Sequence, residues 1–154
     1  MKFILLRRFV LSAAAIALLA ASGCAVLEVK QRELIFRPNK ETYRTPADYG
    51  LAYEDLRLDV RRSNEDVERI HGWWIPSDET NAPALLYLHG SRWNIGHNLV
   101  RIAQLQRMGF SILAVDYRGF GQSDGDLPSE EQVYVDARVA WEELKRRVPE
   151  AHKR

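Results

Sequence analysis

The segments LLYLHGSRWNIGHN, residues 85–98, and GFSILAVDYRGFGQSDG, residues 109–125, hold the strongest indications of the fold. A short, almost continuous apolar run occupies residues 84–88, and another occupies residues 112–115. Such runs are typical of central strands that are covered on both faces. Each run is followed by a polar, glycine-containing turn. The two segments therefore predict two strands in the middle of a sheet.

Two helices are predicted around these strands. Apolar residues recur at mostly helical spacing through residues 97–108, and Gly109 follows as a C-cap residue. A helix between two such strands indicates a crossover that joins parallel strands. A second helix is predicted to begin after Ser129, because Ser129 and Gln132 offer a capping box. Its apolar stripe comprises Val133, Ala137, Ala140, Trp141, Leu144 and Val148.

Two further strands are predicted upstream. Leu56, Leu58 and Val60 alternate with charged residues, which indicates a half-buried strand. Residues 70–75, IHGWWI, form another apolar run, which Pro76 ends. Both are expected on the outer side of the sheet. The alternation of strands and helices predicts an α/β, doubly wound fold with a mostly parallel sheet.

Together, residues 85–98, 109–125 and 128–141 resemble the α/β-hydrolase superfamily, especially its serine-aminopeptidase-like and carboxylesterase-like members. The resemblance covers residues 51–154 and implies an incomplete α/β-hydrolase domain, with strands one to four and the first two helices. It further implies a serine hydrolase that cleaves ester or amide bonds of small-molecule or peptide acyl substrates. No cofactor is expected.

The resemblance also assigns a role to the turn after the first apolar run. There the family places His-Gly and then a residue whose backbone N–H binds the oxyanion of a tetrahedral intermediate. In this chain that residue is Ser91, while His89 and Gly90 are expected to shape the loop. Taken alone, His89-Gly90 is more typical of a strand-ending turn with a hydrogen-bonded histidine.

Other polar and aromatic residues are expected to be structural. Asp116 and Arg118 belong to the loop that forms a wall beneath the family's active site, and both are expected to be ion-paired or hydrogen-bonded. Trp73 and Trp74 are expected in the core.

Residues 121–125, GQSDG, match the G-x-S-x-G pattern of a nucleophile elbow. An elbow requires a strand that runs directly into the first glycine and a helix that begins at the serine. Here residues 117–120 separate the strand from the motif, and residues 124–128 separate the motif from the helix. Ser123 is therefore not expected to be a nucleophile.

By resemblance, the nucleophile elbow would follow a further strand after Arg154, and the acid and histidine of the triad would come later still. The triad is thus expected to be absent from these 154 residues, so this chain alone is expected to be inactive. Without that further strand, residues 84–88 are expected to form an exposed apolar edge that lowers stability. The alternative function is a non-catalytic envelope lipoprotein that binds a partner or small molecule.

The N-terminus predicts a secreted, lipid-anchored protein. Three cations precede an uncharged run of 13 residues, which is shorter than the about 20 that span a bilayer, so residues 1–23 are predicted to be a signal peptide. Residues 21–24, Ala-Ser-Gly-Cys, resemble a lipobox with Cys24 as the lipidated residue. Residues 24–50 would then be a loosely structured tether, and the protein would lie in the cell envelope, at the periplasmic face of the outer membrane in a Gram-negative cell. An uncleaved anchor, or a plain signal peptide with an incidental Cys24, are the alternatives.

Composition argues against other classes of function. Residues 24–154 contain 19 Lys and Arg and 21 Asp and Glu, which gives a net charge of −2. Nucleic acid is therefore not an expected partner. The four histidines lack metal-ligand spacing. Nucleotide binding is disfavoured, because Asp124 stands where G-x-G-x-x-G requires its last glycine.

Overall fold

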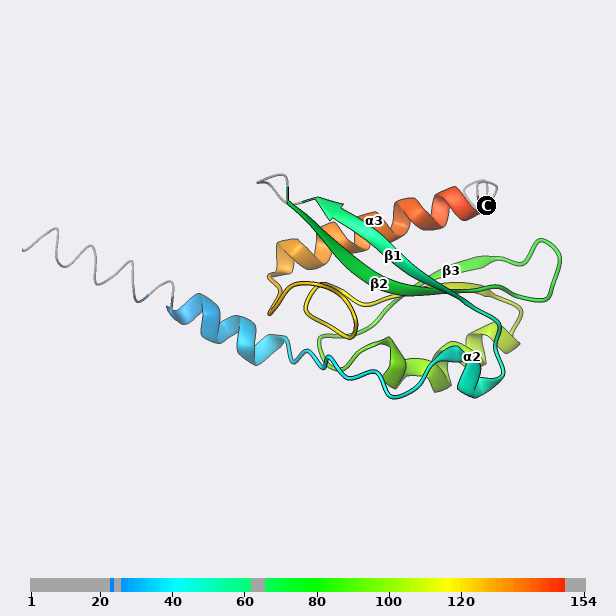
Figure 1. Cartoon of the computed structure of the whole chain (residues 1–154), viewed down its shortest axis with the longest axis horizontal. Coiled ribbons are helices and arrows are strands. Elements are labelled where there is room, and N and C mark those ends of the chain that lie inside the picture. Colours follow the sequence, from blue (N-terminus) through cyan, green and yellow to red (C-terminus); the bar gives the residue numbers. More distant parts are fainter. Residues whose placement is uncertain (1–22, 24–25, 62–65, 149–154) are drawn as a thin grey trace, which may run out of the picture. The chain divides into compact units, whose positions relative to one another are not determined.

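The computed structural model describes residue 23, residues 26–61 and residues 66–148. Its contacts divide the chain into two compact units, Met1–Ile35 and Phe36–Arg154. The second unit contains the sheet and the helices that cover it (Figure 1). Except for residue 23, the predicted signal peptide lies outside the described residues, and so does Cys24.

The first unit contributes one described helix, over residues 26–35. The Lys30 ammonium lies 2.6 Å from the Glu33 carboxylate, an i,i+3 pair that supports an exposed helix. Within the described part of the chain, no helix has both the length and the apolar character required to cross a bilayer.

Four strands form one mixed sheet in the order β1-β2-β4-β3. The strands are β1 (Glu54–Arg61), β2 (Val67–Ile75), β3 (Ala84–Leu88) and β4 (Ser111–Val115). β3 and β4 are parallel, whereas β1 and β2, and β2 and β4, are antiparallel. The prediction of an α/β fold is thus confirmed, but the described sheet is mostly antiparallel. The connections explain the difference: only β3 and β4 are joined through a helix, which is the connection that parallel neighbours need.

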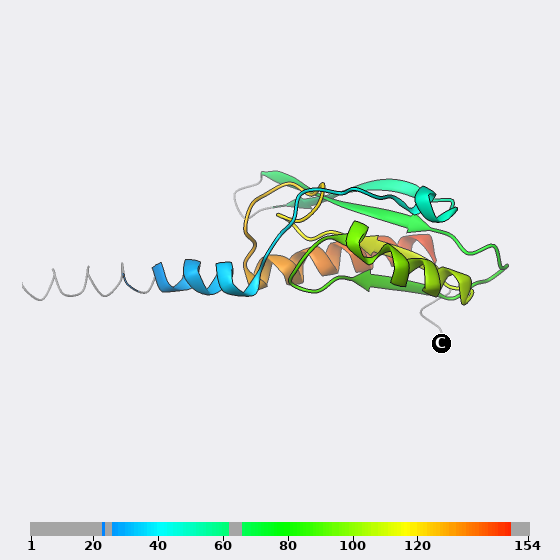
Figure 2. The ribbon, with the colours of Figure 1, turned by 90° about the horizontal axis from the view of Figure 1, so that it is seen from below.

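Helices cover both faces of the sheet. On one face, α2 (Leu99–Arg107) packs through Leu99 and Ile102 against a core that includes Trp73. On the other face, α3 (Glu130–Arg147) packs through Ala140 and Leu144. Successive β4 residues alternate between the two cores, as the pleat of a strand requires. Seen from below, α2 lies in front and α3 behind (Figure 2).

The helix ends follow the predicted signals. Ser129 caps α3, because its Oγ accepts the Gln132 N–H. In the same capping box, Gln132 Oε1 accepts the Ser129 N–H. Gly109, with φ +92°, follows the end of α2 in the left-handed region that glycine tolerates. The predicted stripe of α3 is wrong at one position. Trp141 is 45% exposed, and Asp136 is fully buried although it was not assigned to the stripe.

β3 lies at the edge of the described sheet, and its last residue, Leu88, is 40% exposed. This agrees with the predicted apolar edge.

The loose structure predicted for residues 24–50 is found only in part: residues 36–45 lack helix and strand apart from the bridge at Arg37. Residues 26–35 are helical, and residues 36–50 belong to the second unit. Pro46 begins the 3-10 helix η1 (Pro46–Tyr49), where its fixed φ and missing N–H are tolerated.

Candidate functional site

Two loops leave the same edge of the sheet after the parallel strands β3 and β4. We call residues 89–94 the β3 loop and residues 116–129 the β4 loop. The carboxyl ends of parallel strands in open α/β sheets are where ligands bind. The 3-10 helix η2 (Ile95–Asn98) follows the β3 loop directly and leads into α2.

His89 anchors the β3 loop in the interior. Its Nε2 lies 3.3 Å from Asp116 Oδ1, and its Nδ1 lies 2.6 Å from the carbonyl oxygen of Gly90. The ring also packs against Tyr117 and Phe120, with centroid distances of 4.8 Å to each. His89 therefore holds the β3 loop against the β4 loop.

Asp116 is the fully buried centre of this contact. Its Oδ1 accepts the backbone N–H of Ile95 at 2.8 Å, and its Oδ2 lies 3.5 Å from His71 Nδ1. The two histidine contacts are longer than good hydrogen bonds and act mainly as electrostatic contacts. Burial alone would raise the pKa of Asp116, but the His71 and His89 rings and the Ile95 N–H together hold it below its usual value. Asp116 is thus structural, as expected.

Gly121 permits the close approach of the β4 loop to Asp116. A Cβ at this position, where φ is +49°, would stand 2.0 Å from Asp116 Oδ2. Any side chain here would displace the carboxylate from the β3 loop.

Ser91 stands at the exposed turn of the β3 loop. Its carbonyl oxygen accepts the Arg37 N–H at 2.8 Å, and the Gly90 carbonyl oxygen, which shares a peptide group with the Ser91 N–H, lies 2.6 Å from His89 Nδ1. Within the described residues, the backbone N–H of Ser91 donates to no protein acceptor. A Cβ at Gly90 would meet nothing within 4 Å, so the glycine leaves open space and is not required by the turn itself. The structure thus offers a fixed and free N–H at the residue that the sequence singled out.

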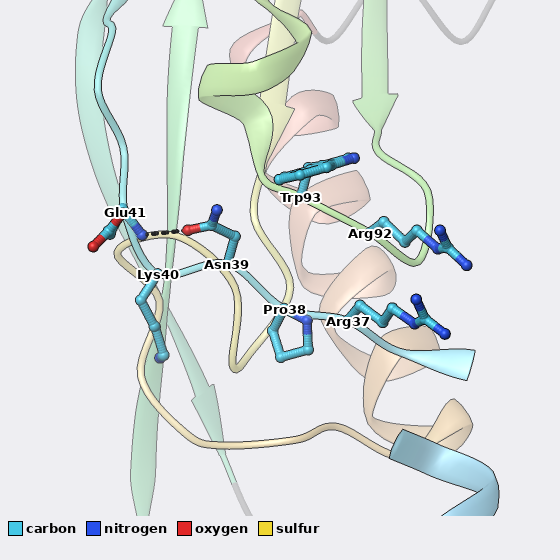
Figure 3. Close-up of a pocket in the computed structure, with 7 residues that line it drawn as sticks. All are labelled: Arg37, Pro38, Asn39, Lys40, Glu41, Arg92 and Trp93. Atoms are coloured by element: carbon cyan, nitrogen blue, oxygen red, sulfur yellow. Dashed lines mark hydrogen bonds between the residues drawn. The ribbon is translucent and has the colours of Figure 1, made fainter. Parts of the chain in front are cut away.

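A cleft opens beside the β3 loop, with a volume of about 510 Å³. It is lined by Arg37, Pro38, Asn39, Lys40, Glu41, Arg92 and Trp93 (Figure 3). We call it the arginine cleft. Arg37 and Arg92 are partners in an isolated parallel bridge, so segments far apart in sequence form the floor of the cleft.

Trp93 forms one wall of the arginine cleft in a strained conformation. Its φ of +67° is unusual for a bulky residue and costs about 1–3 kcal/mol. The ring stacks on His97 at a centroid distance of 4.9 Å, yet remains 54% exposed. Backbone strain of this kind clusters at active sites and at ligand-binding sites.

Ser123 lies in the interior of the β4 loop and is 3% exposed. Its Oγ accepts the His71 N–H and donates to the Asp116 carbonyl oxygen, both at 2.8 Å. The next helix begins only at Glu130. This hydroxyl is neither exposed nor free, and the context of a nucleophile elbow is missing, as the sequence indicated.

Arg118 fastens the β4 loop to α3. Its Nε donates to Asp136 Oδ1 at 2.8 Å, and a terminal nitrogen lies 3.0 Å from Glu68. Burial raises the pKa of Asp136 to about 6, although the Arg118 bonds act in the opposite direction. The predicted structural role of Arg118 is confirmed.

The two tryptophans of β2 also belong to the packing. Trp73 is fully buried, and Trp74 is half-buried with the Arg147 guanidinium 5.5 Å from its ring centre. In the described part of the chain, no group of three His, Cys, Asp or Glu side chains is placed to hold a metal ion.

The sequence did not predict the arginine cleft. Arg37 lay in the expected tether, and Arg92 follows Ser91 without any recognisable motif. The two arginines lie far apart in sequence, where local patterns give no information about contacts. Only the bridge between them brings them together.

No model of a known protein family matches the chain. An uncharacterized protein of Mycobacterium tuberculosis is 31% identical over 132 residues, which is 85% of this chain and 45% of that protein. Lysophosphatidylserine lipase ABHD12 of Danio rerio is 33% identical over 78 residues, which is 49% of this chain and 20% of the lipase. The chain thus spans less than half the length of these curated relatives.

A solved structure shows the same partial coverage. An esterase of Pyrococcus furiosus matches with a TM-score of 0.62 and 25% identity, over 76% of this chain and 43% of the esterase. The chain therefore shares its α/β fold with part of that enzyme.

Proposed function

We propose that this chain, which is related by sequence and fold to the α/β-hydrolase superfamily, supplies the oxyanion-binding half of a serine hydrolase of ester or amide bonds. In this proposal the Ser91 N–H donates to the oxygen that becomes negative during attack on the acyl group. A second N–H, the nucleophile, the acid and the base would come from sequence beyond Arg154. The 154 residues alone would not hydrolyse an ester.

The proposal rests on the backbone of Ser91, whose N–H shares a peptide group with the Gly90 carbonyl oxygen that His89 Nδ1 holds at 2.6 Å. The Ser91 carbonyl is fixed by Arg37, the Ser91 N–H has no protein acceptor among the described residues, and the next side chain, Arg92, is exposed. An oxyanion donor must be held in place before the reaction, because it stabilises charge without having to reorganise. The contact of His89 with buried Asp116 provides this rigidity.

The relatives support the class of reaction. The esterase and the lysophosphatidylserine lipase, as their names say, act on esters and on a lysophospholipid, which favours an acyl ester over other substrates.

The first experiment is to sequence the gene and its transcript beyond codon 154 in all frames. We expect an apolar strand that runs into G-x-S-x-G, with Asp and His downstream. If these are missing, the non-catalytic envelope lipoprotein that binds a partner or small molecule becomes the better account.

The second experiment tests Ser91 in the longer gene product. Ser91→Pro removes the N–H while the carbonyl remains available to Arg37, and we expect kcat for a chromogenic ester to fall roughly 10²- to 10³-fold. Ser91→Ala keeps the N–H and is expected to keep kcat. Equal activity of the two variants would remove Ser91 from the mechanism.

We further propose that Cys24 carries a lipid anchor and that the protein lies in the cell envelope, at the periplasmic face of the outer membrane in a Gram-negative cell. The sequence of residues 1–24 supports this. Mass spectrometry of the N-terminal peptide should find an acylated Cys24, and Cys24→Ala should release the protein from the membrane fraction. An unmodified Cys24 thiol in the mature protein would contradict it.

A further inference from the structure

The arginine cleft places two positive charges on one face. Arg37 and Arg92 are partners in a parallel bridge, where neighbouring backbones lie about 4.8 Å apart and paired side chains share a side. Figure 3 shows both guanidinium groups extending in the same direction. Like charges placed opposite each other repel, so an anion bound between the two arginines would be stabilising.

The described protein does not provide such an anion. Among the residues that the structure describes, neither Arg37 nor Arg92 forms an ion pair, whereas the buried Arg118 contacts both Asp136 and Glu68. Glu41 also lines the cleft, but it lies at the opposite end from the two guanidinium groups (Figure 3).

The third cation of the cleft is already engaged. Lys40 Nζ donates to the carbonyl oxygens of Ser123 and Gly125 at 2.8 and 3.0 Å. The lysine therefore ties the floor of the cleft to the β4 loop, and the two arginines are the groups available to a ligand.

The remaining features describe the shape of that ligand. The strained Trp93 closes one side of the cleft with an aromatic surface, and the volume of about 510 Å³ is in the range of small-molecule sites. Arginine presents a planar set of N–H donors that matches the paired oxygens of phosphate and carboxylate.

We propose that the arginine cleft binds the phosphate or carboxylate of a small organic ligand through Arg37 and Arg92. Because Arg92 follows Ser91 directly, the anion would lie beside the acyl group, so the substrate would be an anionic ester. The binding site stands on the geometry of the cleft alone, while its place beside the scissile bond rests on the proposed function.

Calorimetric titration of the full chain tests the site without any need for catalysis. The probes are inorganic phosphate, acetate, neutral glycerol and a short-chain, water-soluble acylglycerol phosphate. We expect one site for the anions and none for glycerol. Arg37→Gln and Arg92→Gln should each weaken binding roughly tenfold, because each removes a charge-assisted contact.

Arg101→Gln is the matched control, since it removes an exposed arginine of α2 outside the cleft and should leave binding unchanged. The Arg37 substitution keeps its backbone bond to Ser91, and circular dichroism would verify the fold. Tighter binding of the acylglycerol phosphate than of phosphate identifies the headgroup of a substrate, and equal binding identifies a site for free phosphate. Either result supports the anion site.

Absence of anion binding would overturn the proposal. So would an equal loss in all three arginine variants, which would indicate non-specific attraction. A chain that binds anions while the longer gene product shows no hydrolase activity would keep the site and remove only the proposed function.

Discussion

The β3 loop and the β4 loop leave neighbouring parallel strands but have opposite characters. In the β4 loop, Ser123, Asp116 and Arg118 are buried, and their polar atoms bind other parts of the fold. In the β3 loop, Ser91 and Trp93 are exposed, and the Ser91 N–H has no protein acceptor among the described residues. The buried residues of the β4 loop act as a support, and the exposed residues of the β3 loop present the groups that a ligand would meet.

A sequence motif must therefore be interpreted together with the burial and the hydrogen bonds of its side chains. The G-x-S-x-G pattern lies in the supporting loop, where its serine hydroxyl joins two backbone groups. The candidate for chemistry, Ser91, lies in a turn with no distinctive pattern beyond His-Gly.

The largest loss of stability is expected when the contact between the β4 loop and α3 is removed. Arg118→Met leaves the buried Asp136 without its guanidinium partner, so the free energy of unfolding should fall by about 3–5 kcal/mol. Denaturant titration measures this, with the exposed Arg101→Met as the control. Equal stability of the two variants would mean that the β4 loop is not the support described above.

The two serines provide the sharpest contrast. Ser123→Ala removes a hydroxyl that bonds the His71 N–H and the Asp116 carbonyl oxygen, so stability should fall by about 1–3 kcal/mol. Ser91→Ala changes an exposed side chain and should alter stability by less than about 0.5 kcal/mol. The same denaturant titration compares them, and a reversed order would contradict the assignment of the loops.

Asp136 predicts a pH dependence of stability. Its pKa is raised to about 6 in the folded chain from an ordinary value of 3.8, so between these values the folded state holds more protons than the unfolded state. Protonated Asp136 therefore contributes to the free energy of unfolding at low pH, and this contribution is lost as the pH rises through 6. Relative to Asp136→Asn, the wild type should gain on the order of 1 kcal/mol between pH 7.5 and pH 5.

The comparison with Asp136→Asn is needed because other groups titrate in the same range. Denaturant titrations of both proteins at several pH values isolate the aspartate. A difference between them that does not change with pH would show that Asp136 is ionised throughout.

A small effect on stability is also expected at Trp93. Trp93→Asn replaces a strained residue by one that tolerates the left-handed region, but it loses the stacking on His97. These changes oppose each other, so thermal unfolding should report a change below about 1 kcal/mol. A loss as large as that of Arg118→Met would make Trp93 part of the support.

Local patterns predicted the elements well. The four strands, the capping box at Ser129 and the buried Trp73 follow from apolar periodicity and from capping rules, which involve residues close in sequence. That Ser123 does not lie in a nucleophile elbow was also predictable, because an elbow has strict requirements for its neighbours.

Features that join distant segments were not predictable. The bridge between Arg37 and Arg92 and the contacts of the segment before residue 50 depend on how loops meet in space. Burial of Asp136 on α3 could not be anticipated either, because a carboxylate in a helix is ordinarily exposed unless a partner such as Arg118 covers it.

We propose that Ser91 belongs to an oxyanion-binding loop and that the nucleophile lies beyond residue 154. The most direct test is to label the longer gene product with a fluorophosphonate and map the modified peptide. We expect a label on a serine beyond residue 154, in a new G-x-S-x-G, with Ser123 unmodified. A label on Ser123 would contradict it.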